Sequence, residues 1–131
     1  MTTIQAPLAG RRMLVVEDEP LIAMLLEDML GDLDMPVLGT ADSVPAALEL
    51  IETLDGLDGA ILDMNLRGRS VEPVATALAA RGVPFVFASG YGVDALTQRH
   101  AQAPVLPKPF RREALESALL TAFGAPDNTA A

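Results

Sequence analysis

Side chains that can do chemistry follow four separate apolar runs of this 131-residue chain. The runs are Met13–Val16, Ala60–Leu62, Val83–Phe87 and Val105–Leu106. The residues after them are, in the same order, Glu17 with Asp18 and Glu19, Asp63 with Asn65, Ser89, and Lys108, the only lysine. Each run is typical of a strand that is buried on both faces. The carboxyl ends of parallel strands lie along one edge of a sheet, so we expect these side chains to meet there.

Converging carboxylates repel one another unless a cation lies among them. The chain has no cysteine and only one histidine, so the ligands on offer are hard oxygen atoms, which suit Mg²⁺. This ion keeps several waters when bound and leaves coordination places for a phosphoryl oxygen. A carboxylate can attack phosphorus to give an acyl phosphate, while a metal, a lysine and a hydroxyl share the charge of the transferred group. The pattern therefore predicts a site that receives a phosphoryl group.

Helical segments separate the apolar runs, and a further short strand is predicted at Pro36–Leu38. The predicted helices are Pro20–Leu30, Val44–Leu54 with Ser43 as its N-cap, Val71–Arg81, Val93–His100 and Arg111–Phe123. Five strands alternating with five helices predict an α/β fold, in which right-handed crossovers place helices on both faces of a doubly wound parallel sheet. His100, at the end of the fourth predicted helix, is expected to be solvated.

Composition limits the classes of partner and the compartment. The net charge is −9, which disfavours nucleic-acid backbones and anionic membranes as partners. Apolar residues make up 50% of the chain, which argues against disorder. No apolar run approaches the ~18 residues of a membrane span, and residues 1–10 lack the apolar core of a signal peptide. We expect one cytoplasmic domain over residues 11–123, with flexible tails at 1–10 and 124–131.

From residue 12 to residue 123 the chain resembles the receiver domain of two-component response regulators. The resemblance implies a flavodoxin-like (βα)5 domain with strand order 2-1-3-4-5, in which Asp63 is the phosphoacceptor. It implies that Mg²⁺ binds to Asp63, to Asp18, to Glu17 largely through water, and to the backbone carbonyl of Asn65. Two further roles follow for residues at the other strand ends: Ser89 would hydrogen-bond the phosphoryl group, and Lys108, before a cis Lys108–Pro109 peptide, would pair with it.

One position departs from the common receiver pattern. Many receivers carry Tyr or Phe three residues before the lysine as a rotamer switch, and this chain has Val105 there. The segment Phe87–Gly92 instead resembles the Phe-Ala-Thr-Gly-Tyr-Gly signature of a receiver subfamily nicknamed FATGUY, with Ser89 in place of Thr. Members of that subfamily lack the aromatic residue and are associated with HWE or HisKA2-type sensor kinases and a bacterial general stress response. The resemblance makes Tyr91 a candidate switch residue.

The function that follows is a stand-alone receiver, which takes a phosphoryl group from a histidine kinase or a histidine phosphotransfer protein. It would signal by contact with a downstream protein whose identity is unknown, or act as a phosphate sink, as a monomer or a weak homodimer. It would catalyse its own phosphorylation and dephosphorylation without being a turnover enzyme. Arg67 and Arg69, just after Asp63, would meet a kinase, counter the acidic edge, or simply be solvated.

Two alternatives belong to other classes. A phosphohydrolase with an aspartyl-phosphate intermediate usually has a second acid two residues after its nucleophile, to protonate the leaving group. Asn65 occupies that position and cannot donate in this way. A degenerate receiver, acting as an interaction module without phosphorylation, would be favoured by loss of Asp18, Asp63 or Lys108, and all three are present.

Overall fold

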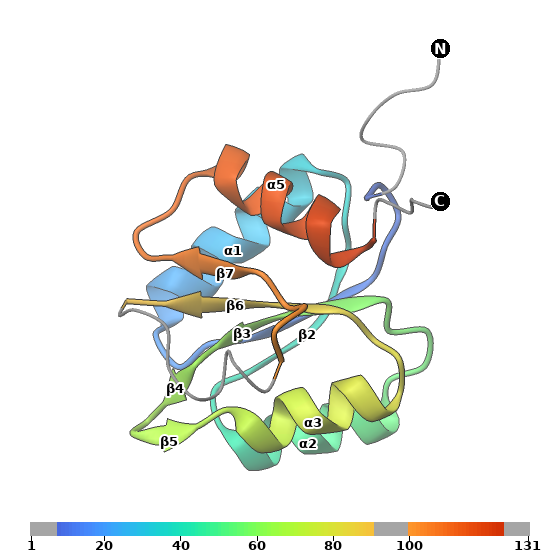
Figure 1. Ribbon diagram of the computed structural model, residues 1–131, viewed down its shortest axis with the longest axis vertical. Coiled ribbons are helices and arrows are strands. Elements are labelled where there is room, and N and C mark those ends of the chain that lie inside the picture. The colour runs from blue at the N-terminus through green and yellow to red at the C-terminus, as the bar shows by residue number, and fades with distance from the viewer. Residues whose placement is uncertain (1–7, 91–99, 125–131) are drawn as a thin grey trace.

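A five-stranded parallel sheet with the order β2-β1-β3-β6-β7 forms the centre of the computed structural model, which describes residues 8–90 and 100–124 (Figure 1). Its strands are β1 (Met13–Val16), β2 (Val37–Ala41), β3 (Gly59–Asp63), β6 (Phe85–Ser89) and β7 (Val105–Pro107). The helices of the described residues are α1 (Pro20–Asp32), α2 (Val44–Thr53), α3 (Glu72–Ala80) and α5 (Arg112–Ala122). Two short strands, β4 (Asn65–Leu66) and β5 (Arg69–Ser70), form a separate antiparallel hairpin.

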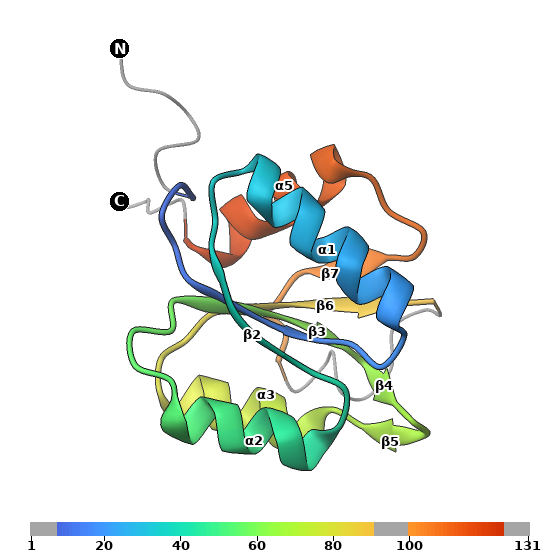
Figure 2. The same ribbon diagram turned by 180° about the vertical axis from the view of Figure 1, so that it is seen from behind.

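The sheet lies between two helical layers, with α1 and α5 on one face and α2 and α3 on the other (Figures 1 and 2). Successive side chains of a strand point to opposite faces, so each strand supplies both layers. In β1, Leu14 and Val16 belong to the apolar cluster that includes residues of α2 and α3, whereas Met13 and Val15 belong to the cluster of α1 and α5. All four are fully buried, which explains why β1 is a continuous apolar run.

Helices α1 and α2 begin at the predicted residues, and α3 and α5 begin one residue later than predicted. Pro20 stands at the first turn of α1, where its missing N–H costs no helical hydrogen bond. Ser43 caps α2, because its hydroxyl oxygen accepts a hydrogen bond from the Ala46 N–H at 3.3 Å, as predicted. The short connection from β1 to α1 therefore holds Glu17, Asp18 and Glu19 at the carboxyl edge of the sheet.

The predicted doubly wound fold is confirmed, since β6 and β7 are the fourth and fifth strands of the order 2-1-3-4-5. Strands β3 and β7 differ from their predicted bounds by one residue at one or both ends, and β2 and β6 differ by more. Strand β2 continues to Ala41, because Gly39 and Thr40 pair with β1 although neither residue extends the apolar run. Strand β6 begins at Phe85 and includes Ser89 as its last residue. The predicted helix at Val93–His100 lies outside the described residues except for His100.

The prediction that His100 is solvated holds only in part, because the residue is half-buried. Its ring packs edge-on against Phe85 and Phe87 of β6, with centroid distances of 5.5 and 6.1 Å. The backbone turns directly after it, since the Ala103 N–H donates to the His100 carbonyl oxygen at 2.9 Å. The imidazole therefore lies against the sheet beside this turn. The surrounding sequence is polar, so it did not predict this packing.

The expected N-terminal tail needs a similar correction at one residue. Leu8 is fully buried and belongs to the apolar cluster beneath α1 and α5. The Gly10 N–H donates to the Asp34 carbonyl oxygen at 2.8 Å, which ties this segment to the end of α1. A single leucine in a short segment gives no periodicity, so its burial could not be predicted.

In the part of the chain that is described, no helix combines the length and apolar character needed to cross a membrane.

Candidate functional site

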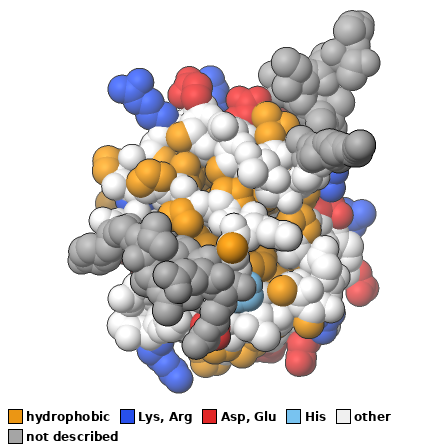
Figure 3. Space-filling model, viewed as in Figure 1, with side chains coloured by type: hydrophobic (Ala, Val, Ile, Leu, Met, Phe, Trp, Pro, Cys, Tyr) orange, Lys and Arg blue, Asp and Glu red, His pale blue; other side chains and the backbone are white. Residues whose placement is uncertain are grey.

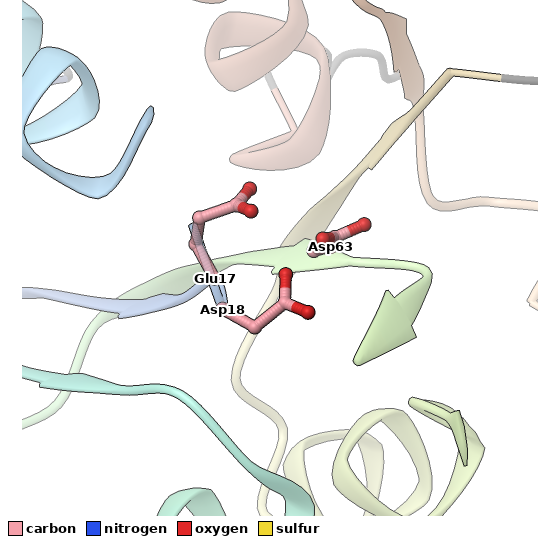
Figure 4. A group of neighbouring side chains, drawn as sticks. All are labelled: Glu17, Asp18 and Asp63. Atoms are coloured by element: carbon pink, nitrogen blue, oxygen red, sulfur yellow. The ribbon is translucent and has the colours of Figure 1, made fainter. Parts of the chain in front are cut away.

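Three of the four carboxylates that were expected to meet do so at the carboxyl ends of β1 and β3, whereas Glu19 is exposed and lies outside the group. These two strands are neighbours, and Val16 is aligned with Leu62, so the residues that follow, Glu17 and Asp63, stand side by side. Figure 4 shows the carboxylates of Glu17, Asp18 and Asp63 pointing into one space, and one oxygen of each lies within 4.8 Å of the others. The connection after β1 and the last residue of β3 thus build one acidic cluster.

Lys108 brings the charge that offsets this cluster. Its Nζ lies 3.1 Å from Glu17 Oε1 and 3.4 Å from Asp63 Oδ2. The Glu17 side chain is fully buried and the Lys108 side chain is 18% exposed, so this contact is shielded from bulk water. The Lys108 backbone N–H donates to the Ser89 carbonyl oxygen at 2.8 Å, which joins the ends of β6 and β7. The expected cis peptide between Lys108 and Pro109 is present.

Burial and neighbouring charges shift the pKa values of Glu17, Asp63 and Lys108. Burial, reinforced by the nearby Asp63, raises the pKa of Glu17 to about 7. Burial also raises the pKa of Asp63, against the opposing pull of Lys108. Burial alone would lower the pKa of Lys108, but its hydrogen bond with Glu17 and the charge of Asp63 outweigh burial and raise it. Near neutral pH the Glu17 carboxyl is therefore partly protonated.

Backbone donors orient each carboxylate. Glu17 Oε2 accepts from the Glu19 N–H at 3.2 Å, and Asp63 Oδ1 accepts from the Asn65 N–H at 3.3 Å. Asp18 Oδ2 accepts from the Arg67 N–H at 2.9 Å. Burial would raise the pKa of Asp18, but hydrogen bonds outweigh it, first among them the bond from Arg67, and the pKa falls below its usual value. Asp18 is therefore the carboxylate most ready to bind a cation.

Ser89 stands at the end of β6, beside the acidic cluster in the sheet order. It is 6% exposed and pairs in register with Pro107, the residue before Lys108. Among the described residues, no atom outside its chain neighbours lies within 4 Å of the position that a Cβ on Gly90 would take. The candidate switch residue Tyr91 lies outside the described residues.

The donor set fits Mg²⁺. Each residue of the cluster offers a carboxylate oxygen, and hard oxygen ligands are those that this ion prefers. The backbone carbonyl of Asn65 was also expected to be a ligand, and Asn65 is the first residue of β4, two residues after Asp63. The acidic cluster, Lys108 and Ser89 therefore form a site at the open edge of the sheet.

A separate hollow of about 810 Å³ lies at the other end of β6 and β7. Residues before and at the start of these strands line it, together with His100 and the end of α5, and His100 is visible on this face in Figure 3. None of the acidic cluster, Ser89 or Lys108 lines this hollow. The chemistry-bearing side chains and the hollow are thus distinct features of the described surface.

Sequence reasoning missed the part that Arg67 plays at this site. It named Arg67 as one of two arginines near the acidic edge, but gave it no definite contact. In the structure its guanidinium donates to Asp42 and its backbone N–H to Asp18. The only signal in the sequence is the glycine after Arg67, which is typical of a two-residue hairpin turn.

Comparison with known proteins identifies the class. Residues 13–120 match the response regulator receiver domain family, and the chain belongs to that family. Receiver domains are phosphoacceptors that bind Mg²⁺ in an acidic pocket, and the cluster of Glu17, Asp18 and Asp63 corresponds to such a pocket. No match was found among curated proteins.

Solved structures with the same fold include close relatives. SdrG from Sphingomonas melonis Fr1, in solution, shares 50% identity over 86% of this chain and 96% of its own, with a TM-score of 0.76. The BeF3-activated conformation of SdrG from Pseudomonas melonis Fr1 also shares 50% identity, over 88% of this chain and 98% of its own, with a TM-score of 0.74. A structure of the PhyR stress response regulator shares 26% identity over 95% of this chain and 49% of its own, with a TM-score of 0.75.

Proposed function

We propose that this chain accepts a phosphoryl group on Asp63 from a phosphohistidine donor, in a reaction that requires Mg²⁺. The observation that carries the proposal is the meeting of three carboxylates within 4.8 Å, with Lys108 Nζ 3.4 Å from Asp63 Oδ2. This arrangement supplies a nucleophile, a set of metal ligands and a fixed cation at one place. The similarity to SdrG in a BeF3-activated conformation supports the same reading.

The reaction joins an Asp63 carboxylate oxygen to phosphorus, while the bond from phosphorus to the donor's imidazole nitrogen breaks. The product is an acyl phosphate on Asp63 and a neutral imidazole on the donor after protonation. Bound Mg²⁺, with Asp18, Asp63, the Asn65 carbonyl and, through water, Glu17 as its ligands, would offset the charge of the phosphoryl oxygens. Lys108 favours the ionised form of Asp63 before attack and pairs with the phosphoryl group afterwards. The Ser89 hydroxyl donates a hydrogen bond to a phosphoryl oxygen once the phosphoryl group is on Asp63.

The surface beside the site fits a protein donor. Leu21, Met24 and Leu25 on α1 are 79%, 58% and 44% exposed, although all are large apolar side chains. They occur at helical spacing in the first two turns of α1, which begins two residues after Asp18. Contiguous exposed apolar residues mark protein-binding surfaces. A histidine kinase or phosphotransfer protein that covers this face would bring its phosphohistidine to the acidic edge.

The pathway we propose is a stress response in the cytoplasm, with a donor kinase of the HWE or HisKA2 type. The support is the similarity to a PhyR described as a stress response regulator and the segment Phe87–Gly92, in which Tyr91 would act as the switch in place of an aromatic residue at Val105. The phosphorylated chain would act through contact with a downstream protein or serve as a phosphate sink, and would lose its own phosphoryl group slowly.

Binding of the phosphoryl mimic BeF3⁻ tests the proposal without a kinase. We expect BeF3⁻ with Mg²⁺ to shift the backbone amide NMR signals of Asp63, Ser89 and Lys108, and to do nothing when Mg²⁺ is left out. The Asp63→Asn variant, which keeps the size of the side chain, should not respond. A wild-type spectrum unchanged by BeF3⁻ and Mg²⁺ together would contradict the proposed function.

A further inference from the structure

Arg67 connects three loops at the carboxyl edge of the sheet. Its backbone N–H donates to Asp18 Oδ2, in the β1–α1 connection, at 2.9 Å. Its guanidinium donates from Nε to the Asp42 carbonyl oxygen at 3.0 Å and from a terminal nitrogen to Asp42 Oδ2 at 2.8 Å. Asp42 directly follows β2, and Arg67 itself belongs to the β4–β5 hairpin. One residue thus links the connections that follow β1, β2 and β3.

The backbone at Arg67 has an uncommon conformation. Its φ is +52°, and that of the next residue, Gly68, is +80°. These two residues join β4 to β5, and a two-residue hairpin loop with both φ values positive favours Asn or Gly at its first position. Arginine carries a Cβ, which makes this left-handed conformation unfavourable. The two bonds from its guanidinium to Asp42 hold the residue there, so the side chain supports a strained turn beside a functional site.

This turn determines what the Asp18 carboxylate can do. The bond from the Arg67 N–H engages Oδ2 of Asp18 and so restrains a carboxylate that faces the acidic cluster. Carboxylates that bind metals are commonly held by a second hydrogen bond of this kind, which fixes their orientation.

We propose that Arg67 is a positioning residue for Asp18: its guanidinium anchors the β4–β5 hairpin to Asp42, so that its backbone N–H holds the Asp18 carboxylate in the orientation that binds Mg²⁺. The inference rests on the Mg²⁺ site of the proposed function and adds a residue that touches neither the metal nor the phosphoryl group through its side chain.

The sign of the effect separates this role from simple electrostatics. Arg67 is a cation near an acidic site, so its removal would by charge alone strengthen the binding of Mg²⁺. The positioning role predicts the opposite, since a freed hairpin leaves Asp18 poorly oriented. Arg69 offers a matched control, because it is an exposed arginine on the neighbouring strand of the same hairpin.

The test is isothermal titration of the full chain with Mg²⁺ alone, with circular dichroism to check the fold of each variant. We expect Arg67→Ala to raise the Kd for Mg²⁺ by about threefold to tenfold, at or below the usual effect of losing a residue that supports a metal ligand. Arg67→Gly relieves the strained turn and still removes the anchor, so it should weaken binding as well. Arg67→Lys keeps the charge and one donor and should recover part of the affinity. Arg69→Ala should leave the Kd unchanged or lower it.

Two results would overturn the inference in distinguishable ways. A wild-type chain that binds Mg²⁺, with an equal or lower Kd in a folded Arg67→Ala or Arg67→Gly variant, would refute the role of Arg67 and leave the proposed function intact. A wild-type chain that binds no Mg²⁺ would refute the proposed metal site and this inference with it.

Discussion

The ammonium group of Lys108 lies 3.4 Å from Oδ2 of Asp63, so the proposed nucleophile already faces a fixed cation in the folded chain. The same ammonium lies 3.1 Å from a buried oxygen of Glu17. A cation held between two carboxylates reduces their repulsion and keeps them close together. The elements that follow β1 and β7 and the end of β3 therefore hold these three side chains together in the folded chain.

Removing the charge of Lys108 tests this balance. Lys108→Met keeps most of the apolar stem but leaves Glu17 and Asp63 without their shared cation. At pH 8 without Mg²⁺ we expect the free energy of unfolding, measured by urea denaturation, to fall by about 2 kcal/mol, the scale of a hydrogen bond to a charged group. Adding Asp63→Asn removes one of the two repelling carboxylates and should restore most of the loss. Equal stability of Lys108→Met and wild type would count against the ion-pair arrangement.

Mg²⁺ should stabilise the chain by mass action. At a concentration ten times the Kd, the free energy of unfolding should rise by about 1.4 kcal/mol, seen as a higher Tm. Asp18→Asn should lose this shift, because it removes a charged ligand without changing the size of the side chain. Glu19→Gln is the matched control, since Glu19 is an exposed neighbour outside the cluster, and it should keep the shift. An undiminished shift in Asp18→Asn would exclude Asp18 as a ligand.

The raised pKa of Glu17 predicts how stability changes with pH in the absence of metal. Its pKa is about 7 in the folded chain, against an ordinary value of 4.5. Between these values the folded chain binds more protons at this carboxyl than the unfolded chain, so its contribution to stability falls as pH rises and is lost above about pH 7. Glu17→Gln stays neutral at every pH. The stability of wild type relative to Glu17→Gln should therefore decline from pH 4.5 to 7, and a difference that is constant or rises would refute the shift.

Ser89 is expected to act after transfer. Ser89→Ala removes the hydroxyl but keeps the backbone carbonyl that accepts the Lys108 N–H at 2.8 Å, so the junction of β6 and β7 should survive. We expect the variant to be labelled on Asp63 by acetyl phosphate, while the NMR shifts that BeF3⁻ causes around Lys108 become smaller. Intact mass and NMR spectra measure the two effects separately. A folded variant that takes no label would show that Ser89 is needed for transfer itself.

Much of the site could be predicted because parallel strands impose it. Apolar runs locate the strands, and the residue after each run must then lie at the carboxyl edge. This argument predicts that Glu17 and Asp63 lie close together, and that Lys108, which follows β7, lies at the same edge. The N-cap at Ser43 was predictable for a different reason, because a side-chain oxygen before a helix satisfies a free backbone N–H.

Contacts that depend on short or irregular backbone could not be predicted. Strands β4 and β5 have two residues each, too few for any periodic pattern. The link from Arg67 to Asp42 depends on that hairpin, and so escaped sequence analysis. His100 illustrates the same limit, because its packing on Phe85 follows from a turn rather than from a pattern of apolar residues.

Intact mass spectrometry after treatment with acetyl phosphate and Mg²⁺ measures whether Asp63 accepts a phosphoryl group. Wild type should gain the mass of one phosphoryl group, while Asp63→Asn treated in the same way, and wild type treated without Mg²⁺, should gain none. A folded wild-type chain that binds Mg²⁺ and gains no mass, or an Asp63→Asn variant that gains as much as wild type, would contradict the account.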